Sequence, residues 1–483
     1  MSIVPWLDVS RPSMQRRWRI DGRVRPVRPD HDGSATVTRV SAMVRTWTAC
    51  KSDEEVVNQV AEDRDIPAPR RLIAVRGRRD VLLNVALALV SLDACTKPAE
   101  PIARSPATLP TVQPPSSVPL PFDEAVLTAA NAIFSSATVA DRSGAVRQPV
   151  VIDPLVDGVT GEQSAATQTI GARIAALARE KYPQFAIEPF GPQAVSRLPY
   201  VIVGTFTPVN ARNVASGDRE AYRFCLIMAD LRSGKVVARA WVRARLEGVD
   251  ASPTAFFRDS PAWTDDAQMK GYIDTCQETH VGDPISPVYL EGIVAASIIS
   301  EAIDAYTAGR YRDAADLYGN ARASNAGNQL RVYNGLYLAN WKLGRQEAAA
   351  TAFGEAVDFG LANRRLGVKI LFRPGSVALD PGADAQPYDM WMEQIATRTA
   401  RSRACLQVTG NTSRTGTAAL NDRLSGLRAN YIKERLVADD PGLNGRLIAT
   451  GVGAKANLIG TGADDATDAL DRRVEFTVIP QCG

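Results

Sequence analysis

The chain has 483 residues, 45% of them apolar, and a formal net charge of +3, so it is long enough for about three globular domains. The basic excess lies in the first 80 residues, and no stripe of basic and aromatic residues follows, which argues against a nucleic-acid partner. His31 and His280 are the only histidines, and no nucleophile is paired with a base, which argues against His-rich metal sites and catalytic triads. We therefore predict that the protein is not an enzyme and has no cofactor and no metal site.

Residues 1–74 contain Trp, Arg and Pro without a sustained helix or strand period. Two interpretations remain open for this segment. It is either a disordered extension or sequence translated upstream of a mis-assigned start.

Residues 75–95 have the organisation of a secretory signal peptide. Arg76, Arg78 and Arg79 precede a 12-residue apolar run over 81–92, which is too short to span a membrane. The last four residues, LDAC, resemble a bacterial lipobox, in which the cysteine becomes the lipidated first residue of the mature protein. The resemblance implies lipidation of Cys95; the alternative is a short buried helix that ends in a cysteine.

A proline-rich segment follows at residues 96–121. Eight prolines lie between 98 and 121, a density that prevents helix and sheet and favours an extended tether. At about 3.1 Å per residue, such a tether extends to roughly 75 Å. The alternative is an ordinary interdomain linker, which leaves Cys95 unexplained.

The first folded domain is predicted over residues 122–286. We expect helices over 123–136 and 165–181 and strands over 149–152, 200–206, 222–230 and 236–242, with Gly204 at a β-bulge and Gly234 in a turn. This element order resembles the periplasmic α/β domains of the CsgG and TolB N-terminal kind, including LpoB-like lipoproteins. Asp153 and Asp157 are expected at a solvated loop edge rather than as a catalytic carboxylate pair, and His280 at the surface.

Residues 287–362 contain an internal repeat. Small residues and one aromatic recur 35 residues apart: Gly309, Ala314, Tyr318 and Ala321, then Gly344, Ala349, Phe353 and Ala356. The pattern resembles tetratricopeptide repeats, which implies two helix pairs. Two units are few for a free-standing solenoid, so we expect this module to pack against its neighbours and to serve as a spacer or to bind a peptide.

The last domain, residues 363–483, contains a strand, a polar turn and a helix in sequence. Alternating residues over 405–409 lead into a turn at 410–416 and then into a segment with helical period. Asn421, Leu424, Ser425 and Arg428 share one face of that helix, just below the turn. We expect a pocket there in which Arg428 presents its planar guanidinium to a carboxylate.

This stretch resembles the OmpA-like peptidoglycan-binding domain. The matching positions in the central motif are Gly410, Thr412, Gly416, Asn421, Leu424, Ser425, Arg428 and Ala429, and residues 371–379 and 471–476 resemble the first and the closing strand of the family. The resemblance implies a β-α-β-α-β-β fold that binds the diaminopimelate of the peptidoglycan stem peptide. The implied binding residues are Thr412, Ser413, Asn421, Arg428, Arg472 and Arg473.

Three positions depart from the family. Asn411 stands where the family usually has His, Ser413 where it has Asp, and Asp471 where it has Asn. The family Asp meets the ammonium group of diaminopimelate and the helix Arg meets its carboxylate. Since losing one partner of a buried charge pair costs about 2–5 kcal/mol, Ser413 is expected to weaken this binding.

Apart from Cys50 and Cys95, each outer domain has one pair of cysteines. Cys225 and Cys276 lie in the first domain and Cys405 and Cys482 in the last, so an oxidising periplasm would join each pair. The alternative is buried free thiols.

The sequence therefore predicts a multidomain α+β protein: an α/β sandwich-like periplasmic domain, a short helical module and an OmpA-like domain. The leading hypothesis is a lipoprotein anchored at the periplasmic face of the outer membrane that binds peptidoglycan non-covalently. The alternative is a periplasmic scaffold with weakened wall affinity, in which residues 122–360 dock a cell-wall synthase or a secretion or flagellar assembly.

Overall fold

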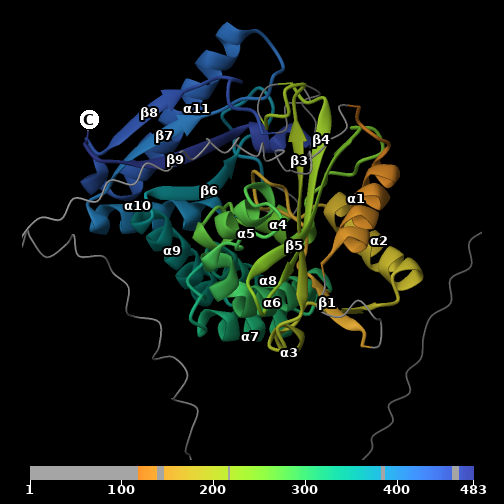
Figure 1. The fold of residues 1–483 in the computed structure, drawn as a ribbon. Coiled ribbons are helices and arrows are strands. Elements are labelled where there is room, and N and C mark those ends of the chain that lie inside the picture. Colours follow the sequence, from red (N-terminus) through yellow and green to blue (C-terminus); the bar gives the residue numbers. More distant parts are fainter. Residues whose placement is uncertain (1–117, 139–145, 216–217, 382–386, 459–466, 483) are drawn as a thin grey trace, which may run out of the picture. The chain divides into compact units, whose positions relative to one another are not determined.

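The computed structural model describes residues 118–138, 146–215, 218–381, 387–458 and 467–482, which form a mixed α/β structure with two mixed sheets (Figure 1). The signal segment, Cys95 and the tether up to residue 117 lie outside the described residues, as does the segment 1–74. We refer to residues 122–286 as the N-terminal α/β region, to 287–362 as the helical region and to 363–483 as the C-terminal region.

Five strands form the sheet of the N-terminal α/β region, in the order β2-β1-β3-β4-β5. They are β1 (Gln148–Ile152), β2 (Phe185–Glu188), β3 (Tyr200–Val209), β4 (Ala221–Asp230) and β5 (Lys235–Ala244). Strand β1 runs parallel to both neighbours, whereas β3, β4 and β5 form an antiparallel meander. The four strands expected from the apolar periodicity are present, and β2 is an additional edge strand that the sequence analysis missed.

Alternating side chains along the strands divide between two apolar cores. One core lies between the sheet and the helices α1 (Phe122–Ser136) and α2 (Ala165–Lys181), which lie side by side in Figure 1. The other core lies against α5 (Ala267–Gln277) and the first half of α6 (Pro287–Thr307). Phe224 and Leu226 of β4 enter the first core and Ile227 enters the second, as the two-residue period of a strand requires. Two short helices, α3 (Pro192–Val195) and α4 (Ala255–Asp259), complete this region.

The two glycines singled out in this sheet have different roles. Gly234 lies in the β4–β5 turn with a φ of +65°, and its N–H donates to Asp230 O over 2.8 Å. The prediction of a bulge at Gly204 is wrong, because this residue pairs in regular register with Leu226. A side chain there would overlap Leu155, so close packing explains the glycine. The sheet irregularity falls instead between Met228 and Ala229.

Four helices form the helical region: α6, α7 (Tyr311–Arg322), α8 (Leu330–Lys342) and α9 (Gln346–Ala362). Gly309 and Gly344, with φ of +74° and +72°, lie in the turns that follow α6 and α8. The repeated positions are buried in both helix pairs: Ala314 and Ala349, Tyr318 and Phe353, and Ala321 and Ala356. The two pairs therefore bury the same pattern of small residues and one aromatic.

The C-terminal region has the element order β-α-β-α-β-β. The strands are β6 (Arg365–Leu371), β7 (Cys405–Gly410), β8 (Leu447–Gly451) and β9 (Arg473–Ile479), arranged in the order β6-β9-β7-β8. Two long helices, α10 (Tyr388–Ser402) and α11 (Ala418–Asp439), connect the first three strands, and η1 (Pro441–Leu443) and η2 (Thr467–Asp471) are short 3-10 turns. Only the β7–β8 pair is parallel, since β9 runs antiparallel to both β6 and β7.

The helical and C-terminal regions share one hydrophobic core. A single cluster of buried side chains extends from Tyr318 and Phe353 of the helices to Trp391 on α10 and Phe476 on β9. Trp391 donates its indole N–H to the hydroxyl of Tyr337 on α8 over 3.0 Å. The helical region therefore packs on the C-terminal region, as expected for two repeat units that are too few to form a free-standing solenoid.

A buried ion pair joins β6 to the N-terminal α/β region. The ammonium of Lys369 pairs with the carboxylate of Glu162, and both side chains are less than 10% exposed. The same ammonium also donates to Phe257 O over 3.1 Å and lies 4.3 Å from the ring centroid of Trp263. Trp263 N donates to Gly367 O, so backbone and side-chain contacts fix β6 against this segment.

Candidate functional site

The polar turn after β7 is held close to helix α11. A side chain at Gly410 would overlap the backbone of Ser425, and one at Gly451 would overlap Gly426, so both strand ends reach the helix only because they carry glycine. Thr417 caps α11 by accepting a hydrogen bond from Leu420 N. This close approach brings the turn 411–413 directly against the buried face of α11.

The helix face predicted from the sequence is present. Asn421, Ser425 and Arg428 are all at most 5% exposed and lie on the side of α11 that faces the turn. The hydroxyl of Ser425 accepts a hydrogen bond from Gly453 N over 2.9 Å, which ties the helix to the segment after β8. The turn, the helix and the segment after β8 thus converge in one polar cluster.

Arg428 is fully buried, which differs from the accessible fork that the sequence analysis expected. Its Nη1 donates to Asn411 O over 2.9 Å, its Nη2 to Arg373 O over 3.0 Å and its Nε to Ser376 O over 2.9 Å. The guanidinium carbon lies 5.1 Å from the ring centroid of Phe372. The reason is that the segment after β6 folds back over α11 and directs its carbonyl groups at this side chain.

Residues 411–413 form a turn that is almost entirely buried. Asn411, Thr412 and Ser413 are 1%, 2% and 5% exposed. Asn411 N donates to Arg473 O and Thr412 N donates to Gly453 O, so the backbone of the turn is satisfied. Asn457 reaches the turn from the other side and donates its side-chain N–H to Thr412 O over 3.0 Å.

Three side-chain oxygens around this turn have no hydrogen-bond partner among the described residues: Asn411 Oδ1, Thr412 Oγ1 and Asn457 Oδ1. A buried oxygen without a partner costs about 1–3 kcal/mol, so such groups are rare in proteins unless a water or a ligand supplies the donor. The cluster is therefore chemically suited to a ligand that carries N–H groups.

Arg472 and Arg473 hydrogen-bond to the backbone around this cluster. Arg472 is 3% exposed and donates to Phe372 O, whereas Arg473 donates to Leu470 O and Ala456 O and pairs with Glu475 over 2.7 Å. Both side chains thus hold the segments on either side of the turn. All six predicted binding residues lie around the turn and the α11 face, each of them 5% exposed or less.

The sequence analysis missed the residues that approach this site from the N-terminal α/β region. Asp218, in the β3–β4 connection, forms an ion pair with Arg414 over 2.5 Å. Burial lowers the pKa of the neighbouring Arg219, while the charges of Tyr222, Asp157, Asp471 and Asp468 act to raise it. Asp218 and Arg219 are about 200 positions before the turn, so no sequence spacing indicated that they contact this site.

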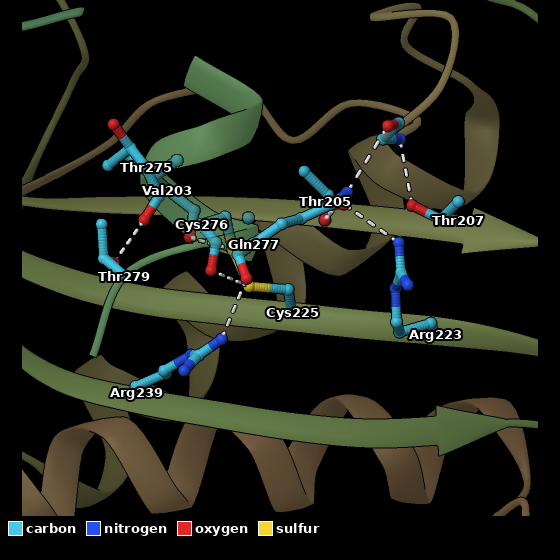
Figure 2. Close-up of a disulfide and its surroundings, with 12 residues drawn as sticks. Val203, Thr205, Thr207, Arg223, Cys225, Arg239, Thr275, Cys276, Gln277 and Thr279 are labelled. Carbon is cyan, nitrogen blue, oxygen red and sulfur yellow. Dashed lines mark hydrogen bonds between the residues drawn. A yellow bond between two sulfur atoms is a disulfide. The ribbon is translucent and has the colours of Figure 1, made fainter. Parts of the chain in front are cut away.

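Both predicted cysteine pairs lie within disulfide bonding distance. Cys225 on β4 is joined to Cys276 on α5, with 6.1 Å between the Cα atoms (Figure 2). Cys405 at the start of β7 is joined to Cys482, which follows β9, with 5.2 Å between the Cα atoms. Cys95, the predicted lipidation site, lies outside the described residues.

The expected solvation of Asp153 is wrong. This side chain is 4% exposed, and the hydroxyl of Tyr289 on α6 donates to its Oδ2 over 2.9 Å. Burial raises the pKa of Asp153 to about 7, against the opposing effects of the Arg331 charge and of the Tyr289 hydrogen bond. His280 is at the surface, as expected, with its Nδ1 3.4 Å from Asp283.

None of the described helices has the length and apolarity that a membrane span requires. No family model matches the chain, and a search of curated proteins found no match.

Several solved structures are similar to part of the chain. The peptidoglycan-associated lipoprotein from Burkholderia pseudomallei is 22% identical, with 23% of this chain and 89% of that chain covered and a TM-score of 0.20. The cell wall anchor of the T6SS from Pseudomonas aeruginosa is 23% identical, with coverage of 27% and 97% and a TM-score of 0.21. The periplasmic domain of Helicobacter pylori MotB is 21% identical, with coverage of 20% and 67% and a TM-score of 0.17. The chain is thus similar over about a quarter of its length to these proteins, and TM-scores this low assign it to no family.

Proposed function

We propose that the protein acts in the bacterial cell envelope and binds peptidoglycan non-covalently through its C-terminal region. The observation that carries this proposal is the set of side-chain oxygens of Asn411, Thr412 and Asn457, in and around the buried turn beside Arg428, that have no hydrogen-bond partner among the described residues. Oxygen acceptors of this kind suit the amide and ammonium N–H groups of a stem peptide. The resemblance of residues 363–483 to the OmpA-like family supports the same ligand.

In this proposal Arg428 has a positioning role. Its donors are taken by the carbonyl groups of Arg373, Ser376 and Asn411, so it fixes the turn rather than facing open solvent. The side chains of Thr412, Ser413 and Asn421 are then the groups closest to the proposed ligand. The carbonyl groups of the segment after β6 would have to release the guanidinium before it bound a ligand carboxylate.

Co-sedimentation of the full chain with purified peptidoglycan sacculi tests this proposal. Thr412→Val removes one unpartnered oxygen and is expected to lower retention about tenfold. Ser413→Asp supplies the carboxylate that the family carries and is expected to raise affinity by at least about tenfold. Thr477→Val on β9 is the matched control, because Thr477 is exposed and pairs with Gln407 in the middle of β7 rather than with the turn, and it should behave as the parent does.

Two results would overturn the proposal. One is a parent chain that stays in the supernatant at every amount of sacculi. The other is retention that neither Thr412→Val nor Ser413→Asp changes while both variants keep the circular dichroism spectrum of the parent.

We further propose that Cys95 carries a lipid and that residues 96–121 lead from the outer membrane to the folded regions. The signal-like segment before Cys95 and the eight prolines behind it support this arrangement. Mass spectrometry of the mature protein tests it directly. A diacylglyceryl mass on residue 95 is expected, and an unmodified residue 95 or a mature chain that retains residues 1–74 would contradict it.

A further inference from the structure

Two arginines and a tryptophan share one face of strands β4 and β5. Arg239 and Trp241 lie two residues apart on β5, and the β4 residues directly opposite them are Ile227 and Cys225. Arg223 lies two residues before Cys225, so it points to the same side of the sheet. The opposite side of β5 is apolar and packs against α1. The charged face thus lies on the side of the sheet that carries the disulfide.

The indole of Trp241 holds both guanidinium groups close together. The guanidinium carbons of Arg223 and Arg239 lie 5.4 and 4.8 Å from the centroid of its ring. Arg223 also lies directly opposite Arg243, and like charges in that position destabilise a sheet. The face therefore concentrates positive charge on two neighbouring strands.

The hydrogen bonds of Arg223 and Arg239 go to neutral acceptors within the described chain. Arg223 donates to Asn213 O over 3.1 Å and to Gln277 Oε1 over 3.0 Å, and Arg239 donates to Gln277 O over 3.1 Å. Figure 2 shows Gln277 between the two arginines, next to the disulfide. Since Cys276 is bonded to β4, the disulfide fixes the neighbouring Gln277 and thereby the spacing of the two cations.

This pattern differs from that of some other arginines in the same region. Arg173 pairs with Asp123 and Arg197 pairs with Glu188, whereas Arg147 and Arg245, like Arg223 and Arg239, donate to neutral groups. Arg223 and Arg239 are half-buried, and burial lowers the pKa of both guanidinium groups, against the opposing charge of Asp157 for Arg223 and of Asp283 for Arg239. Their hydrogen bonds nevertheless go to neutral groups of Asn213 and Gln277.

We propose that this face is a docking surface for an acidic segment of a protein partner. Guanidinium groups bind carboxylates in a planar fork, which supplies the charge complementarity. Arginine and tryptophan are also the residue types most enriched among the side chains that dominate protein interfaces. A sheet face lined by these side chains suits an extended peptide. The surface is distinct from the proposed wall site, so either proposal can fail without the other.

Calorimetric titration of the full chain with a hexaglutamate peptide at low salt tests this inference. We expect saturable binding that weakens about tenfold or more in Arg239→Gln, because one charge-assisted contact is lost. Arg232→Gln is the matched control, since Arg232 is exposed in the β4–β5 turn, and it should bind as the parent does. Arg239→Gln should retain the circular dichroism spectrum of the parent, which shows that the variant is folded.

Three outcomes would overturn the inference. The first is the absence of saturable hexaglutamate binding to the parent. The second is equal affinity of Arg239→Gln and the parent. The third is binding of inorganic phosphate or of phosphatidylglycerol vesicles, lost in Arg239→Gln, without any binding of hexaglutamate, which would assign the face to phosphate groups.

Discussion

Arg428 in the C-terminal region and Arg239 and Asp153 in the N-terminal α/β region differ in how their charges are compensated. In the C-terminal region, the guanidinium of Arg428 is fully buried and donates to three backbone carbonyl groups. In the N-terminal α/β region, Arg239 is half-buried and donates to one. Asp153 is buried there as well, with the hydroxyl of Tyr289 as its hydrogen-bond donor. The hydrogen bonds of Arg428 hold its charge within the folded structure. The charge of Asp153 can instead be neutralised by a proton, and that of Arg239 by a binding partner.

The largest effect is expected for Arg428→Ala. Three carbonyl groups lose their donor in a buried polar cluster, which should lower the free energy of unfolding by about 5 kcal/mol. Urea unfolding monitored by circular dichroism measures the change. Arg423→Ala, an exposed position on the same helix, is the control and should stay within about 0.5 kcal/mol of the parent. A loss for Arg428→Ala as small as that of the control would remove the distinction between the two regions.

An intermediate effect is expected from the titration of Asp153. Its pKa is raised from 3.8 to about 7 in the folded chain, so the folded state binds more protons than the unfolded state between these values. The contribution of Asp153 to stability is therefore fullest below pH 4 and falls by about 4 kcal/mol as the pH rises through 7, since each unit is worth about 1.4 kcal/mol. Asp153→Asn removes this titration. Urea unfolding from pH 4 to 8 should show a flatter profile for the variant, and parallel profiles would contradict the assignment.

The smallest effect is expected for Arg239→Gln. Removing a half-buried cation that has one hydrogen bond and one ring contact should lower the free energy of unfolding by no more than about 1 kcal/mol. The same urea experiment measures it. A decrease of more than about 2 kcal/mol in the free energy of unfolding would show that Arg239 stabilises the fold, as Arg428 does.

Local patterns in the sequence predicted much of the framework. The helix over 165–181 has the predicted bounds, and the face of Asn421, Ser425 and Arg428 follows from helical spacing alone. The two disulfides followed from one cysteine pair in each outer region. These features depend on residues close together in the sequence or on the number of cysteines in each region, and both can be read from a single sequence.

The remaining features depend on contacts between distant segments. Two of the three carbonyl groups that accept hydrogen bonds from Arg428 belong to Arg373 and Ser376, more than 50 residues away. Asp153 is buried because Tyr289, 136 residues later, covers it. The two-residue period places Arg223 and Trp241 on one sheet face, but it carries no information about whether a carboxylate lies nearby. Sequence periodicity thus indicates which face of a helix or strand a side chain lies on, but not which distant residue pairs with its charge.

The ion pair between Lys369 and Glu162 has a mechanical consequence. Strand β6 is held to the N-terminal α/β region by this ion pair, and its apolar side chains belong to the core shared with the helical region. A force applied to the C-terminal region would therefore act on packed side chains of all three regions. If the C-terminal region binds peptidoglycan as proposed, a pull on it would then be resisted by regions far apart in the sequence. A truncation that ends near residue 362 would expose the apolar side of that core, so shortened chains are expected to aggregate rather than to act as separate domains.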